Sequence, residues 1–195
     1  MLDHIVFDVE IAKTIEEVGG WNNTEKMGVA VACLWQHIDQ RMRVYGPDDV
    51  PALKERLLKA DRVSSYNGLM FDCPVVWELP KSEWKLGHPV YDKILPKTND
   101  LLRRIWQALG FDPDKWQPGM GNAKLDNIAQ ATLGVGKIGN GADAPKWYQA
   151  GQIQRVVNYC CDDVCLERDL TDFVDRYGFV IHMGKQLFLK EWKGA

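Results

Sequence analysis

A short hydrophobic segment near the start of the sequence ends in two acidic residues. The apolar residues 5–7 are followed by Asp8 and Glu10, which are separated by a single residue. Alternate side chains of a β-strand lie on the same face, so we expect Asp8 and Glu10 to project together from a buried strand. Neighbouring carboxylates raise each other's pKa unless a cation lies between them, and Mg²⁺ and Mn²⁺ prefer carboxylate oxygens. The pair is therefore either a solvated strand end or part of a metal site.

A second acidic position follows a predicted strand over residues 62–66. The chain turns at Asn67-Gly68, and Asp72 then opens a predicted helix over residues 71–79. An Asp in the first turn of a helix commonly caps it or interacts with its dipole. The local pattern leaves Asp72 as either a capping residue or a further metal ligand.

A third acidic position lies inside a long predicted helix over residues 147–177. Tyr159 and Asp163 are four residues apart, so they share one face, at the edge of the hydrophobic stripe. Neighbouring helix positions differ by about 100°, so we expect Asp162 to point towards solvent. A carboxylate at the edge of a buried surface needs a partner, which is here either Tyr159 or a metal ion.

The composition is that of one globular domain, which we expect to span residues 1–195. Hydrophobic residues make up 46% of the chain and charged residues 26%, which argues against a disordered protein. A net charge of −3 excludes a generally basic protein but allows a basic groove beside an acidic site. The first apolar run is too short for a signal peptide or a membrane span, so no membrane partner is expected. Five cysteines without a paired C-x-x-C indicate free thiols and a reducing, cytoplasmic setting.

The order of the predicted elements indicates an α/β fold with a mixed central sheet flanked by helices. Strands over residues 4–10, 28–36 and 41–45 form an antiparallel three-strand opening. Residues 80–98 are expected to be irregular, and residues 136–145 to form a glycine-rich connection. No glycine-rich nucleotide-binding fingerprint follows a strand in the sequence. The other expected elements are helices over residues 47–60, 99–109 and 124–133, and a terminal hairpin made by residues 179–182 and 186–189.

Together, the three acidic motifs resemble those of the DEDD superfamily of 3′–5′ exonucleases, and within it the DEDDy branch that includes the proofreading domains of polymerases. Asp8 and Glu10 form D-x-E, residues 67–72 match N-G-x-x-F-D, and residues 159–163 match Y-x-x-x-D. The segments over residues 125–134 and 151–160 also resemble those that precede the third motif. The resemblance covers about residues 3–175. Residues 80–98 and the C-terminal extension over residues 179–195 have no clear counterpart.

The resemblance implies a ribonuclease-H-like fold and hydrolysis of phosphodiester bonds at the 3′ ends of single strands, with DNA favoured over RNA. It implies that Asp8, Glu10, Asp72 and Asp163 bind two divalent cations, Mg²⁺ or Mn²⁺, and that Tyr159 is catalytic. Because a phenol with a pKa near about 10 is a poor base, we expect Tyr159 to orient the attacking water. Two alternatives are a ribonuclease-H-like, structure-specific endonuclease and a non-catalytic nucleic-acid-binding module.

The resemblance also implies partners and substrate contacts. The expected partners are single-stranded DNA or RNA, and a polymerase or another replication or DNA repair protein acting in trans. Asn67, Leu69, Met70, Phe71 and Lys124 are the candidate substrate-binding residues. Each has a structural alternative, which is core packing for the apolar side chains and a solvated surface for the lysine.

Tryptophans in or beside the irregular segments are further candidates, because aromatic rings stack on single-stranded bases. These are Trp84, Trp116 and Trp147, with burial in the core as the alternative for each. Lys137 and Lys146 flank the glycine-rich connection and are candidates for phosphate contacts, with a solvated surface as the alternative for each.

Overall fold

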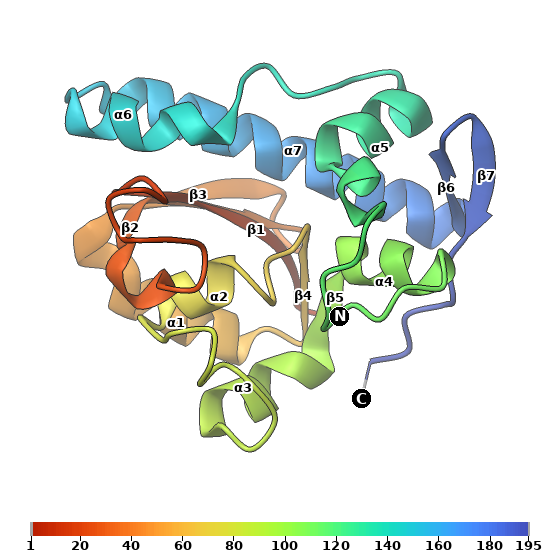
Figure 1. Ribbon diagram of the computed structural model, residues 1–195, viewed down its shortest axis with the longest axis horizontal. Coiled ribbons are helices and arrows are strands. Elements are labelled where there is room, and N and C mark those ends of the chain that lie inside the picture. The colour runs from red at the N-terminus through yellow and green to blue at the C-terminus, as the bar shows by residue number, and fades with distance from the viewer. Residues whose placement is uncertain (1, 195) are drawn as a thin grey trace.

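The structure is a computed structural model that describes residues 2–194, and it has an α/β fold with a five-stranded mixed sheet (Figure 1). The strand order is β3-β2-β1-β4-β5. β1 (His4–Ile11), β2 (Val29–Gln36) and β3 (Arg41–Tyr45) pair antiparallel, whereas β4 (Arg62–Ser65) is parallel to β1 and β5 (Thr98–Asp100) is parallel to β4. This confirms the predicted α/β class, the mixed sheet and the antiparallel opening.

Helices cover both faces of the sheet, and α7 (Ile153–Tyr177) lies along one face with α6 (Ala144–Gln149) beside it (Figure 1). A terminal hairpin, β6 (Phe179–His182) with β7 (Lys185–Phe188), follows it as expected. No helix among residues 2–194 is long and apolar enough to cross a membrane. The remaining helices are α1 (Val50–Lys59), α2 (Asp72–Val76), α3 (Pro89–Ile94), α4 (Leu101–Ala108) and α5 (Leu125–Leu133), with 3-10 turns η1 (Thr24–Lys26), η2 (Pro47–Asp49), η3 (Leu95–Lys97), η4 (Met120–Ala123) and η5 (Gly141–Asp143).

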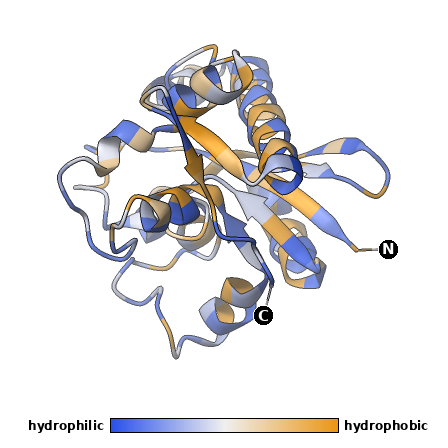
Figure 2. Cartoon of the chain, turned by 90° about the vertical axis from the view of Figure 1, so that its right-hand side faces the viewer, coloured by the Kyte–Doolittle hydropathy of each residue, from blue (hydrophilic) through white to orange (hydrophobic). Residues whose placement is uncertain are grey.

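The central strand β1 is buried on both faces. Ile5, Phe7 and Val9 point to the side covered by α1, α2 and α3, and Val6 packs against Val164 and its neighbours on α7. Figure 2 shows the middle of the sheet in orange, while the covering helices carry both hydrophobic and hydrophilic colours. Burial of apolar surface stabilises a protein by about 25 cal/mol per Å². Because β1 is buried on both faces, it forms the hydrophobic centre of the molecule.

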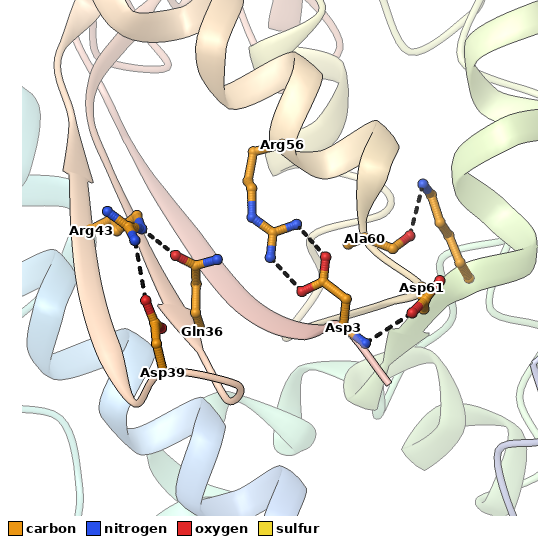
Figure 3. Close-up of polar contacts among 8 residues, drawn as sticks. Asp3, Gln36, Asp39, Arg43, Arg56, Ala60 and Asp61 are labelled. Atoms are coloured by element: carbon orange, nitrogen blue, oxygen red, sulfur yellow. Dashed lines mark hydrogen bonds and ion pairs between the residues drawn. The ribbon is translucent and has the colours of Figure 1, made fainter. Parts of the chain in front are cut away.

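Polar contacts fix the end of the sheet where β1 begins (Figure 3). Arg56 of α1 forms two hydrogen bonds to the Asp3 carboxylate, at 2.6 and 2.9 Å, and the Asp3 N–H donates to Asp61. At the same end, Arg43 binds Asp39 across the β2–β3 turn at 3.1 Å. Ion pairs therefore anchor the end of the sheet where β1 starts. The acidic residues Asp8 and Glu10 lie towards the other end of this strand.

Two predictions about the elements were wrong. Residues 80–98, expected to be irregular, contain α3 and η3 and lead into β5. These elements have three to six residues, too few for a hydrophobic period to be visible. The predicted helix over residues 147–177 is in fact two helices, α6 and α7, with Gly151 at φ +73° between them.

Asp100, the last residue of β5, organises the turn that leads into α2. Its carboxylate caps α4 by accepting the Arg103 N–H at 3.3 Å, and it also accepts the N–H groups of Asn67 and Leu69 at 3.0 and 3.1 Å. Asn67 has φ +72°, a conformation that Asn tolerates better than most residues. Between them, Gly68 passes so close to Ser65 that a Cβ atom at residue 68 would lie 2.5 Å from the Ser65 Cβ.

We therefore predict that Gly68→Ala lowers the free energy of unfolding by about 1–3 kcal/mol, because a buried turn must move to admit the methyl group. Urea denaturation of the variant and the wild type measures the effect. Gly121→Ala is the matched control, since the new Cβ would lie 3.6 Å from Trp116, an ordinary contact. In a Ser65→Gly background the cost of Gly68→Ala should shrink, and an unchanged cost would refute the steric explanation.

Candidate active site

A cleft of about 780 Å³ lies where β1 ends, and the four predicted metal-binding acids are among the residues that line it. Asp8 and Glu10 come from β1, Asp72 from the first residue of α2, and Asp163 from the middle of α7. The structure therefore brings together the four predicted metal-binding acids from three separate parts of the chain. Their convergence depends on the sheet, because β1 lies between α2 on one side and α7 on the other.

Short contacts hold the acids in place. The Val9 N–H donates to the Asp72 carboxylate at 3.1 Å, which fixes α2 against β1 between the two acids of that strand. The Cys160 thiol of α7 donates to the Asp8 backbone oxygen at 3.5 Å. One ligand atom each from Asp8, Glu10 and Cys160 lie within 4.8 Å of one another. Among the described residues, this close spacing includes Asp8 and Glu10 but not Asp72 or Asp163.

The environment makes ionisation of these acids unfavourable. Burial and the nearby Asp163 charge raise the pKa of Asp8 to about 7. Burial, with the Asp8 charge in second place, raises the pKa of Glu10 and that of Asp72 well above their ordinary values. Burial also raises the pKa of Asp163, and the adjacent Lys137 opposes that shift. A cluster of this kind holds its protons unless positive charge enters the cleft.

Lys137 brings such a charge from the glycine-rich connection. Its ammonium group pairs with Asp163 at 2.5 Å and lies 5.1 Å from the centre of the Tyr159 ring. Its backbone N–H donates to Asp126 at 2.7 Å, which fixes that part of the connection. Burial disfavours the charged ammonium, but the carboxylates of Asp163 and Asp8 outweigh this and raise the pKa of Lys137. The sequence analysis gave Lys137 either a phosphate contact or a solvated surface, and did not predict its pairing with Asp163.

Tyr159 lies next to Asp163 and Lys137 but is not among the residues that line the cleft. The ring packs edge-on against Trp147, with centroids 5.7 Å apart, and Gly139 passes close enough that a Cβ there would lie 3.2 Å from the ring. Within residues 2–194 the buried hydroxyl has no hydrogen-bond partner. Burial raises the pKa of Tyr159, so the phenol is protonated at neutral pH and can hydrogen-bond to a ligand.

The expected helix register is confirmed, since Asp163 is 3% exposed and Asp162 is exposed. One turn later, α7 carries a further buried acid, outside the cleft lining, that the sequence analysis missed. Glu167 is 2% exposed, and its Oε2 atom has no partner within the described chain. Burial raises its pKa well above the ordinary value, and the charges of Asp8 and Asp72 add to the shift. Its i+4 spacing from Asp163 was the available signal.

The candidate substrate contacts divide into two groups. Asn67, Phe71 and the exposed Lys124 line the cleft. Leu69, by contrast, is 2% exposed in the hydrophobic core, with Met70 packed beside it, and neither lines the cleft. The turn over residues 67–71 has one side towards the cleft and one towards the core, and a motif spacing does not reveal which residue takes which side.

The three candidate tryptophans do not offer a free ring in the cleft. Trp84 is 1% exposed and belongs to the core, as its structural alternative predicted. Trp147 packs against Tyr159, and Trp116 is exposed but lies outside the cleft lining. A different residue, Trp21, lines the cleft and is 60% exposed.

Comparison with known proteins gives a likeness in structure and not in sequence. No protein-family model matches the chain, and no curated protein is significantly similar to it. Among solved structures, the family B DNA polymerase from the hyperthermophilic archaeon Pyrobaculum calidifontis matches with a TM-score of 0.59 and 17% identity. The match covers 89% of this chain and 24% of the polymerase chain, so the chain spans about a quarter of that protein. At this identity the likeness is one of fold, and the α/β fold of this chain is therefore similar to part of a DNA polymerase.

Proposed function

We propose that the protein is a metal-dependent 3′–5′ exonuclease of the DEDDy type with a ribonuclease-H-like fold. It would hydrolyse phosphodiester bonds at the 3′ ends of single strands, with DNA favoured over RNA. The observation that carries this proposal is the convergence of Asp8, Glu10, Asp72 and Asp163 in one cleft. Tyr159 lies next to Asp163, and its hydroxyl has no hydrogen-bond partner among residues 2–194. The likeness in fold to a DNA polymerase supports a nucleic-acid substrate and a partner of the replication or repair class.

The donor set fits two hard divalent cations such as Mg²⁺ or Mn²⁺, because all four acids offer oxygen ligands and resist ionisation without added positive charge. When bound, the cations would supply an activated water and stabilise the leaving oxygen of an in-line displacement. Cys160 would remain a neutral thiol, since burial raises its pKa, and its hydrogen bond to the Asp8 backbone makes it a support for that ligand.

The other residues have roles that do not depend on proton abstraction. Tyr159 keeps its proton at neutral pH, so we assign it to orienting the attacking water through its hydroxyl group. Lys137 places a positive charge beside Asp163, which favours an anionic phosphodiester in a cleft whose charged residues are mostly acids. Asn67 and Lys124 line the cleft, which supports assigning them contacts with the sugar-phosphate backbone.

Digestion of 5′-labelled single strands tests the proposal. We expect a ladder of products shortened from the 3′ end with Mg²⁺ or Mn²⁺ and intact strands with EDTA. Parallel DNA and RNA strands of the same sequence give the sugar preference. A closed circular single strand separates the alternatives, because an exonuclease cannot cut it and an endonuclease can. Binding without cleavage in every metal would indicate a non-catalytic module.

Two adjacent acids provide an internal control. We predict that Asp163→Asn lowers the cleavage rate by at least about 10²-fold, because it removes a buried ligand and the partner of Lys137. Asp162→Asn should remain within a few-fold of the wild type, because that side chain is exposed. Initial rates of both variants at one Mn²⁺ concentration decide which of the two acids is the ligand. An inactive Asp162→Asn beside an active Asp163→Asn would assign the ligand to Asp162 instead.

The raised pKa of Asp8 predicts how stability depends on pH. Its pKa is about 7 in the folded protein against an ordinary 3.8, so the folded state holds a proton that the unfolded chain releases. Stability of the metal-free protein should therefore fall as pH rises from about 4 to about 7. Asp8→Ala should weaken this trend, abolish cleavage and leave the fold intact.

Thermal unfolding with and without Mn²⁺ at neutral pH completes this test. Metal should raise the midpoint of the wild type by at least about 3 °C and that of Asp8→Ala by much less. Equal shifts in the two proteins would remove Asp8 from the ligand set.

A further inference from the structure

The connection between β1 and β2 carries a large aromatic side chain to the mouth of the cleft. Trp21 is 60% exposed and lines the cleft together with Ile15 and Phe71. Gly19 and Gly20 precede it at φ +80° and +124°, values that other residues rarely adopt. The sequence is therefore built for a sharp turn immediately before the tryptophan.

The connection that carries Trp21 is well anchored. The Thr24 hydroxyl donates to the Leu79 backbone oxygen at 2.6 Å, and η1 packs beside α2, which supplies Asp72. From the other side, Gln149 of α6 donates to the Ala12 backbone oxygen at 3.0 Å and to Glu17 at 2.9 Å. In Figure 1 this orange-red segment lies near α2. Trp21 thus stands on a fixed support beside the acids.

Phe71 packs against the indole of Trp21, and Lys81 in turn packs against Phe71. The ring centres of Trp21 and Phe71 are 5.7 Å apart and tilted by 57°, and the Lys81 ammonium lies 5.7 Å from the centre of Phe71. Phe71 is therefore already in contact on two sides and only partly exposed. Trp21 is the ring of this group with a large area still free.

We propose that Trp21 is a base-stacking residue that holds an unpaired nucleobase within the last few nucleotides of the strand. Aromatic side chains bind single-stranded bases through their π-faces whatever the base, and a base inside a duplex already stacks on its neighbours. The residue therefore gives a preference for single-stranded ends, with Phe71 and Lys81 as its support. This inference rests on the proposed function, because it takes the ligand of the acidic cleft to be a nucleic-acid strand.

Binding to two matched single-stranded oligonucleotides tests the proposal. One 5′-fluorescein single strand has ordinary bases throughout, and the other has abasic residues at its last three positions. Fluorescence anisotropy is measured with Ca²⁺, and a gel confirms that the strand stays intact. Trp21→Ala should weaken binding of the ordinary strand by at least about tenfold. Binding of the abasic strand should be nearly the same for Trp21→Ala and the wild type.

Two matched variants complete the experiment. Trp21→Phe should retain most of the affinity, and Trp116→Ala should bind as the wild type does, since Trp116 is 72% exposed but lies outside the cleft lining. Wild-type affinity in Trp21→Ala, or an equal loss on both strands, would overturn the inference. Binding that depends on Trp21, together with no cleavage in the separate assay with Mg²⁺ or Mn²⁺, would refute the proposed exonuclease and support the stacking role. Absence of binding by the wild type would overturn both.

Discussion

Burying several carboxyl groups in one cleft is unfavourable, and much of the structure around β1 compensates for it. The Val9 N–H binds Asp72, and the ammonium of Lys137 binds Asp163. These contacts relieve only part of the repulsion, since the pKa values of Asp8, Glu10 and Asp72 remain high. The site therefore stores electrostatic free energy that a bound cation would release, and the hydrophobic burial of β1 on both faces supplies the stability that permits this.

The division of β1 into two ends follows from the same constraint. At its beginning, partly exposed ion pairs such as Asp3–Arg56 add modestly to stability and need only partial desolvation. At its other end, the acids face one another in a partly enclosed space, where mutual repulsion is strong. One strand is thus both the central strand of the sheet and the source of two acids of the candidate site.

The sequence predicted features that depend on local periodicity. The alternation in β1 placed Asp8 and Glu10, and the helical period distinguished Asp163 from Asp162. It could not predict β5, whose three residues are held by pairing with β4, more than thirty residues earlier in the chain. It also missed Trp21, because an irregular connection carries no period, and only the packing of that connection against α2 determines which aromatic ring reaches the cleft. Leu69 shows the converse, since a family motif marks a segment but not the direction of each side chain in it.

Asp100 links the edge of the sheet to the candidate site through a single carboxylate. The same two oxygens cap α4 and hold the amides of Asn67 and Leu69, and the turn that contains these residues presents Asp72. Local opening of the β4–β5 edge would therefore release the turn, so the site and the edge strand share one cooperative unit of local unfolding. In such a unit, hydrogen exchange at the two amides reports on the integrity of the acidic cluster, although neither amide belongs to it.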